Sequence, residues 1–171
     1  MAWQNDPLVL YHGTVTPFAN DISQRKRPDL TKARARSDFS VGFYTTRVRK
    51  QAEDFANKKY HRMLRLCQQN SMNLDPRSAA VVELLIDRNR LGRLDTLAFV
   101  FGEVDWHDFV TYCRTGIRGH RGPGSYYDVV YGPVATNTGE WWKYEQLSFH
   151  TTPAINQLDV VAIHLGSPRF T

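Results

Sequence analysis

Two short segments of the sequence combine residue types that can bind a ligand. The first is His12-Gly13-Thr14, which follows the apolar run Leu8–Tyr11, and the second is Gly42-Phe43-Tyr44-Thr45-Thr46. Imidazole and hydroxyl groups can hydrogen-bond a polar ligand, glycine allows a close approach to the backbone, and an aromatic ring can stack on a flat ligand. A lone histidine at a strand end is more often structural than functional, so neither segment is decisive by itself.

Together, the two segments resemble the diphtheria-toxin-like and poly(ADP-ribose)-polymerase-like class of ADP-ribosyltransferases. In that class, a His-Gly-Ser/Thr strand end and a Gly-Phe-Tyr-Ser/Thr-Thr strand form the NAD pocket. The class also has a second aromatic residue on the next helix after ten intervening residues, and Phe55 stands at that spacing from Tyr44. The resemblance implies that the two rings stack on both sides of the nicotinamide. The alternative is that they simply pack the strand against its helix.

The resemblance implies a binding role for the residues around these rings. The backbone of Gly13 would hold the nicotinamide carboxamide, while His12 and Thr45 would hydrogen-bond the ribose hydroxyls. The predicted NAD-binding set is His12, Gly13, Thr14, Arg34, Phe43, Tyr44, Thr45 and Phe55.

A late strand, 144–150, supplies the candidates for the chemical step. The class breaks the bond between ribose and nicotinamide through an oxocarbenium-like transition state, which usually requires a carboxylate near the ribose. Glu145 and Gln146 must point to opposite sides of a strand. Gln146 shares its side with polar residues and Glu145 with apolar ones, which favours Gln146 and leaves Glu145 as the alternative. The predicted catalytic set is His12, Tyr44, Gln146 and Glu145.

Three longer blocks resemble a group of short bacterial proteins in which glutamine holds the position of the catalytic glutamate. The blocks are Asp38–Thr46, Tyr127–Ala135 and Gln146–Thr151. An amide lacks the charge that would activate an acceptor hydroxyl for chain elongation. The resemblance therefore implies mono-ADP-ribosylation, with NAD as co-substrate and no metal.

The basic character of the chain favours anionic partners. Lys and Arg number 22 against 17 Asp and Glu, a formal net charge of +5. A guanidinium group suits phosphate geometry, so Arg34 is the candidate for the NAD pyrophosphate, with Arg36 and Arg25 as alternatives.

A second basic region, the glycine-rich segment 114–124, is a candidate for binding the acceptor. Arg118 and Arg121 would contact a phosphate backbone, and Trp141 and Trp142 would stack on unpaired bases. A solvated connector with a buried tryptophan pair is the alternative.

These observations favour an intracellular bacterial mono-ADP-ribosyltransferase that modifies RNA or a protein. Small free-standing domains of this type are often the toxin of a toxin-antitoxin or antiphage pair, so a cognate antitoxin is an expected partner. An NAD glycohydrolase and a catalytically inactive nucleotide-binding or RNA-binding module are the alternatives.

The fold that must position these residues is predicted to be α+β and a single domain, 1–171. The length and a hydrophobic content of 42% suit one core. Strands are expected at 8–12, 39–46, 79–86, 126–134, 144–150 and 160–165, helices at 49–66 and 95–115, and an exposed basic loop at 16–37. The resemblance implies two packed, mostly antiparallel sheets that form the NAD cleft, with flanking helices.

The remaining composition indicates a cytoplasmic protein. Its two cysteines, Cys67 and Cys113, fit neither a metal site nor a disulfide framework. No apolar stretch approaches the length of a membrane span, and the first residues do not resemble a secretion signal.

Overall fold

The computed structural model describes residues 5–70, 75–136 and 141–171, and these residues form an α+β fold with two mostly antiparallel sheets. They divide into two compact units, each assembled from separate segments of the chain. The first unit contains Pro28–Tyr44 and Asp87–Gln157, with the segment that ends at Asp6. The second unit contains Pro7–Arg27, Thr45–Ile86 and Leu158–Thr171.

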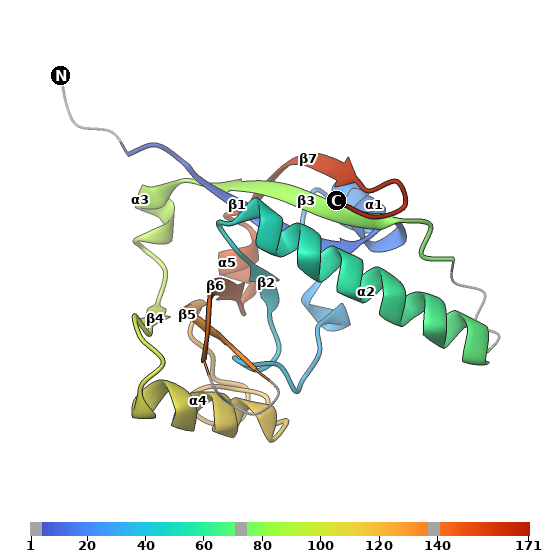
Figure 1. Cartoon of the computed structure of the whole chain (residues 1–171). Coiled ribbons are helices and arrows are strands. Elements are labelled where there is room, and N and C mark those ends of the chain that lie inside the picture. Colours follow the sequence, from blue (N-terminus) through green and yellow to red (C-terminus); the bar gives the residue numbers. More distant parts are fainter. Residues whose placement is uncertain (1–4, 71–74, 137–140) are drawn as a thin grey trace. The chain divides into compact units, whose positions relative to one another are not determined.

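The second unit is a three-stranded antiparallel sheet with two helices (Figure 1). Its elements are β1 (Leu8–Val15), α1 (Thr16–Arg25), α2 (Arg49–Asn70), β3 (Ala79–Ile86) and β7 (Asp159–Leu165). The strand order is β1-β3-β7, and α2 runs along β1 and β3. The central strand, β3, reads Ala-Ala-Val-Val-Glu-Leu-Leu-Ile and is almost wholly buried, as a strand paired on both edges and covered by a helix should be.

The first unit carries the second sheet, in the order β2-β6-β5-β4. Its elements are the short 3-10 turn η1 (Leu30–Lys32), β2 (Phe43–Thr45, which ends one residue into the second unit), α3 (Arg88–Leu91), β4 (Thr96–Ala98), α4 (Val104–Arg114), β5 (Val129–Ala135), β6 (Trp141–Phe149) and α5 (Thr152–Ile155). β5 and β6 are antiparallel, and the short β4 lies parallel to β5.

Each unit has its own apolar core. In the second unit, small residues on α2 face the sheet: Ala52 and Ala56 are buried with Val15 and Val81. In the first unit, Phe39, Trp106, Val110 and Val130 form the buried cluster. Small side chains on one face of α2 allow the helix axis to come close to the strands.

Most predicted elements are present, with shifted ends. The strand 79–86 is confirmed as β3, and α2, β5, β6 and β7 match their predicted positions within a few residues. β2 covers only 43–45 of the predicted 39–46, because residues 37–42 form turns and Ser40 has a positive φ of 66°. The predicted α+β class is confirmed, while packing of the two sheets around an NAD cleft stays a prediction.

Two predicted elements are wrong. The segment 16–37 is not a loop throughout, because Thr16–Arg25 forms α1. Pro17 suits the first turn of a helix, where its missing N–H is not needed, and Ala19 and Ile22 are buried at helical spacing. The segment 95–115 is not one helix either: Thr96–Ala98 forms β4, and α4 begins only at Val104.

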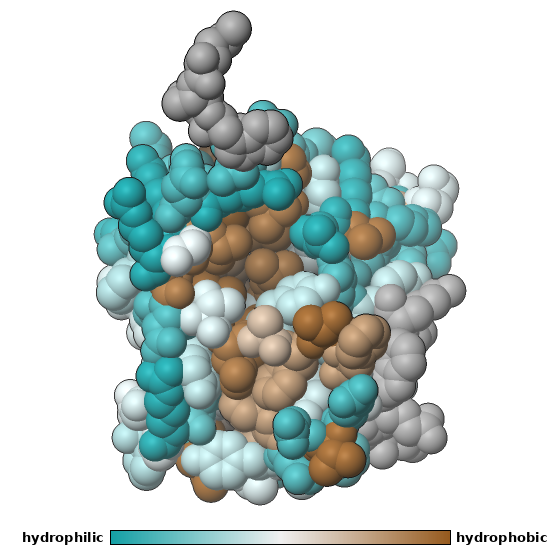
Figure 2. Space-filling view, turned by 90° about the vertical axis from the view of Figure 1, so that its left-hand side faces the viewer, coloured by the Kyte–Doolittle hydropathy of each residue, from teal (hydrophilic) through white to brown (hydrophobic). Residues whose placement is uncertain are grey.

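Hydrophobic side chains are exposed where β4 connects to α4. Val100, Phe101 and Val104 are 70%, 70% and 72% exposed. Figure 2 shows brown hydrophobic surface among teal on the side of the molecule that carries α3, β4 and α4 in Figure 1. Within the described residues, the helices are too short or too polar to cross a membrane.

Candidate functional site

The predicted site residues divide between the two units. His12, Gly13, Thr14, Thr45 and Phe55 belong to the second unit, and Arg34, Phe43, Tyr44, Glu145 and Gln146 belong to the first. The geometry of each set is therefore described within its own unit.

The His-Gly-Thr segment lies on β1, opposite Ala80–Val82 of β3. His12 is half-buried, and Thr14 is fully buried with its hydroxyl 3.0 Å from Nζ of Lys59. Gly13 faces α2 so closely that a Cβ at this position would lie 2.2 Å from the Ala52 carbonyl oxygen. Glycine at residue 13 is therefore required by helix packing, whatever it contributes to a ligand.

The other predicted NAD-binding residues, Phe43, Thr45 and Phe55, differ sharply in solvent exposure. Phe43 and Thr45 are buried at 8% and 3% exposure, whereas the ring of Phe55 on α2 is 61% exposed. The neighbouring residues Ala52 and Ala56 face the sheet, so Phe55 does not serve to pack α2 against it. Within the second unit, the ring of Phe55 therefore takes no part in packing the helix against a strand.

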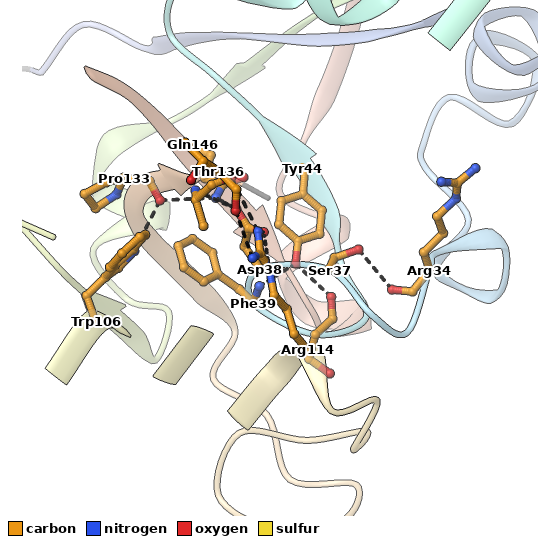
Figure 3. A network of polar contacts seen from close by, with 12 residues as sticks. Arg34, Ser37, Asp38, Phe39, Tyr44, Trp106, Arg114, Pro133, Thr136 and Gln146 are labelled. Carbon is orange, nitrogen blue, oxygen red and sulfur yellow. Dashed lines mark hydrogen bonds and ion pairs between the residues drawn. The ribbon is translucent and has the colours of Figure 1, made fainter. Parts of the chain in front are cut away.

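Tyr44 anchors the turn that precedes β2 (Figure 3). Its hydroxyl donates to the Ser40 carbonyl at 2.7 Å and accepts from the Phe39 backbone N–H at 2.9 Å. Burial raises the pKa of Tyr44 well above its ordinary value, and the nearby Asp38 carboxylate raises it further. Its hydroxyl therefore stays protonated and is committed to the turn, so a ligand would meet the ring of Tyr44 and not its hydroxyl.

Two buried histidines also hydrogen-bond backbone carbonyls of this turn. Nε2 of His120 lies 2.9 Å from the Phe39 carbonyl, and Nδ1 of His150 lies 2.6 Å from the Val41 carbonyl. The centroids of the two imidazole rings are 4.4 Å apart. Burial lowers the pKa of His120, and burial together with the neighbouring His120 lowers the pKa of His150 to about 3. Both imidazoles are therefore neutral near pH 7.

Glu145 and Gln146 have separate partners on β6. Gln146 is 8% exposed, and its Nε2 lies 2.9 Å from Oδ2 of Asp38 and 3.3 Å from the Pro133 carbonyl. Glu145 accepts a hydrogen bond from the hydroxyl of Tyr131. Within the first unit, the structure thus brings Gln146 near the Asp38–Ser40 turn that Tyr44 anchors (Figure 3).

Asp38 is the functional candidate that sequence reasoning missed. Its carboxylate accepts from Nη2 of Arg114 at 2.8 Å, from the Ala135 backbone N–H at 2.9 Å, and from Gln146. Asp38 opens one of the matching sequence blocks, but its pairing with a residue 108 positions away has no local signal.

The basic residues proposed for the pyrophosphate occupy different settings. Arg25 forms an ion pair with Asp21 on α1. In Figure 3, the guanidinium of Arg34 points away from the Asp38 network, and its backbone carbonyl accepts from Ser37 at 3.3 Å. Arg36 is exposed and lies beside Gly116. A Cβ built on Gly116 would be 3.4 Å from Nε of Arg36.

The residues proposed for acceptor binding are only partly described. Arg121 pairs with Asp95 at 2.7 Å and stacks over Tyr127, with its guanidinium carbon 3.7 Å from the ring centroid. The hydrogen bond to Asp95 raises the pKa of Arg121. Arg118 is exposed. The side chains of Trp141 and Trp142 lie outside the described residues.

No cluster of three or more histidine, cysteine, aspartate or glutamate side chains suited to a metal ion occurs in the described part of the chain. Cys113 is buried, and burial with the nearby Asp38 raises its pKa to about 12, so its thiol is neither ionised nor accessible.

The model of one protein family, described as a protein of unknown function (DUF3990), matches residues 8–144. No curated protein matches the chain, and no solved structure does. The matched range contains all of the predicted site except the late strand beyond Tyr144.

Proposed function

We propose that this chain, which belongs to the DUF3990 family of proteins of unknown function, is an NAD-dependent mono-ADP-ribosyltransferase. The observation that carries the proposal is the order and spacing of the motifs along the sequence. The element types agree with it, since His12 lies on a strand, Tyr44 on a second strand, Phe55 on the helix that follows and Gln146 on a late strand.

In the proposed reaction, the bond between nicotinamide and ribose C1′ breaks, and nicotinamide leaves with the bonding electrons. An acceptor oxygen or nitrogen forms the new bond to C1′ and loses its proton. Tyr44 and Phe55 would stack on the nicotinamide, Gly13 would hold its carboxamide, and His12 would bind a ribose hydroxyl. Gln146 would hydrogen-bond the ribose as positive charge develops on it.

The neutral amide of Gln146 favours a single transfer, because activation of a further ribose hydroxyl for chain elongation needs a base. The net charge of +5 favours an anionic acceptor surface, with RNA ahead of protein. We further propose that the enzyme acts in the cytoplasm as the toxin of a toxin-antitoxin or antiphage pair.

A catalytically inactive binding module is the second candidate, and specific contacts favour it. The Tyr44 hydroxyl, the Gln146 amide protons and the Thr14 hydroxyl all have internal partners, as they would in a fold that had kept the motif only for stability. Phe55 favours a functional pocket, because an aromatic ring that is 61% exposed adds little to the stability of the fold.

The decisive experiment incubates the protein with NAD labelled in the adenylate phosphate and a cell extract, followed by separate protease and nuclease treatment. Label that survives protease and is lost to nuclease identifies an RNA or DNA acceptor. Nicotinamide released at full rate without labelled macromolecule would identify a glycohydrolase. Binding of NAD with no nicotinamide release would identify an inactive module.

A further inference from the structure

Asp38 is positioned to control the orientation of the Gln146 side chain. The two N–H bonds of Gln146 Nε2 point to two acceptors, Oδ2 of Asp38 at 2.9 Å and the Pro133 carbonyl at 3.3 Å. Both partners can only accept a hydrogen bond, because a carbonyl oxygen and an ionised carboxylate have lone pairs but no proton to donate. The amide therefore has one satisfactory orientation.

The donors around Asp38 come from α4 and from β5. Nε and Nη2 of Arg114 lie 3.2 Å and 2.8 Å from Oδ1, and the Ala135 backbone N–H lies 2.9 Å from Oδ2. Arg114 is itself fixed, since its Nη1 donates to the Thr136 carbonyl at 2.9 Å. A charge-assisted, forked pair of this kind fixes geometry more firmly than a neutral hydrogen bond.

The consequence for Gln146 is that only its carbonyl oxygen is left for a ligand. Among the described residues, Oε1 has no hydrogen-bond partner. Every fully buried side-chain oxygen or nitrogen in that part of the chain does have one, so Oε1 must reach solvent. Figure 3 shows Asp38 between Arg114 and Gln146.

We propose that Asp38 is a positioning residue that makes Gln146 present Oε1, a pure acceptor, to a ligand hydroxyl. This inference rests on the proposed function, in which that hydroxyl belongs to the ribose of NAD. It also accounts for glutamine in place of glutamate at residue 146. A glutamate would set a second carboxylate against Oδ2 of Asp38, where like charges cannot both ionise at hydrogen-bond distance.

The proposal predicts that Gln146→Glu impairs the protein and does not convert it into a better enzyme. One of the two carboxyl groups would keep its proton, so the pKa of the pair would rise above that of a free glutamate. A carboxyl whose folded-state pKa is raised binds more protons in the folded state, so stability falls as pH rises above about 4.3 and through the raised value. The melting temperature of Gln146→Glu relative to wild type should therefore drop between pH 5 and pH 8.

The test compares wild type, Gln146→Glu, Asp38→Asn and a control, Asp108→Asn, which changes an aspartate whose side chain is 78% exposed on α4. Three readouts are used: nicotinamide release from NAD, melting temperature against pH, and the side-chain amide signals of Gln146 in ¹⁵N-labelled protein, assigned by their loss in Gln146→Glu.

In wild type, the amide signals of Gln146 should exchange slowly with water, and Asp38→Asn should shift them and speed their exchange. Asp38→Asn should lower kcat about tenfold with the KM for NAD within about twofold, as expected for a lost orienting hydrogen bond. Asp108→Asn should change none of these.

Unchanged Gln146 amide signals or full kcat in Asp38→Asn would overturn the proposal, as would a Gln146→Glu protein with wild-type activity and no pH-dependent loss of stability. If wild type releases no nicotinamide, the proposed function fails. The amide signals and the pH dependence then decide separately whether Asp38 orients Gln146.

Discussion

The ring of His150 occupies the space that a side chain at residue 42 would need. A Cβ on Gly42 would lie 2.5 Å from Cε1 and 2.6 Å from Nδ1 of His150. The same Nδ1 donates to the Val41 carbonyl, so the ring cannot withdraw without losing that hydrogen bond. The glycine that opens the Gly-Phe-Tyr-Thr-Thr motif is thus explained by a histidine 108 positions later.

Gly42→Ala should therefore destabilise the protein by about 1–3 kcal/mol, the usual range for overpacking a buried site. Urea unfolding measures the change. Gly92→Ala is the matched control, because the nearest atom to a Cβ at residue 92 is 3.4 Å away. If the clash is the cause, His150→Ala should recover part of the loss in the double variant, and simple additivity would count against it.

Gly13→Ala should be more damaging than Gly42→Ala. The atoms in the way are backbone atoms of α2, with the Ala52 carbonyl oxygen at 2.2 Å and the Ala56 nitrogen at 2.9 Å, so no side chain can move to relieve the clash. We expect a loss above about 3 kcal/mol, or no folded protein. Loss of activity in this variant would therefore say nothing about nicotinamide binding, and a folded, stable variant would contradict the helix contact.

Stability should fall as the solution is acidified below about pH 6.5. His120 and His150 both have lowered pKa values, that of His150 being about 3, so the unfolded chain binds protons that the folded protein does not. Folding free energy contributed by these groups is complete above the unfolded pKa of about 6.5 and is lost progressively below it. For His150 alone, the loss between pH 7.5 and pH 5 should be about 2 kcal/mol.

Urea unfolding at several pH values measures this slope. His150→Gln should reduce it, whereas His107→Gln should leave it unchanged, because the side chain of His107 is 57% exposed. An equal slope in wild type and His150→Gln would show that other groups cause the acid sensitivity.

Phe55→Ala should separate binding from stability. An exposed side chain contributes little to folding, so the free energy of unfolding should change by less than about 0.5 kcal/mol. If the ring stacks on nicotinamide, the KM for NAD should rise by up to about tenfold, and Phe55→Tyr should restore it. Phe101→Ala, which removes an aromatic ring that is 70% exposed elsewhere, is the control.

His12→Ala and Tyr44→Ala should each reduce nicotinamide release by at least about 100-fold, since each removes a group that positions the ligand. Because the Tyr44 hydroxyl also anchors the Phe39–Ser40 turn, folding of each variant must be checked by circular dichroism. His61→Ala alters an exposed histidine and should keep full activity. Wild-type release by a folded His12→Ala protein would remove His12 from the site.

The sequence was sufficient for elements with strong periodicity. β3 is an apolar run interrupted only by Glu83, and α2 repeats alanines and aromatics at helical spacing, so both are predicted well. α1 does not stand out in the sequence because Pro17, Asn20 and Asp21 are typical of loops, although proline is also favoured in a first helical turn. β4 has three residues, too few for a pattern, and exists through its pairing with Val129–Tyr131.

In the candidate site, too, some features follow from the local sequence pattern and others depend on the folded structure. The opposite facing of Glu145 and Gln146 follows from strand alternation and is found in their separate partners. The role of Asp38 does not follow from any local pattern, because the ion pair and the hydrogen bonds that define it join residues from α4, β5 and β6. Contacts between distant segments depend on the fold and produce no periodic pattern in the sequence.

The interleaving of the two units has a consequence for synthesis on the ribosome. The second unit needs the strand 159–165 to complete its sheet, yet 79–86, the strand with which it pairs, emerges far earlier. Until Asp159–Leu165 is translated, one edge of Ala79–Ile86 lacks the partner that it has in the folded unit, and its backbone can pair with another nascent chain. Fragments that stop before Asp159 should therefore aggregate, and neither unit can be expressed as one continuous piece of the sequence.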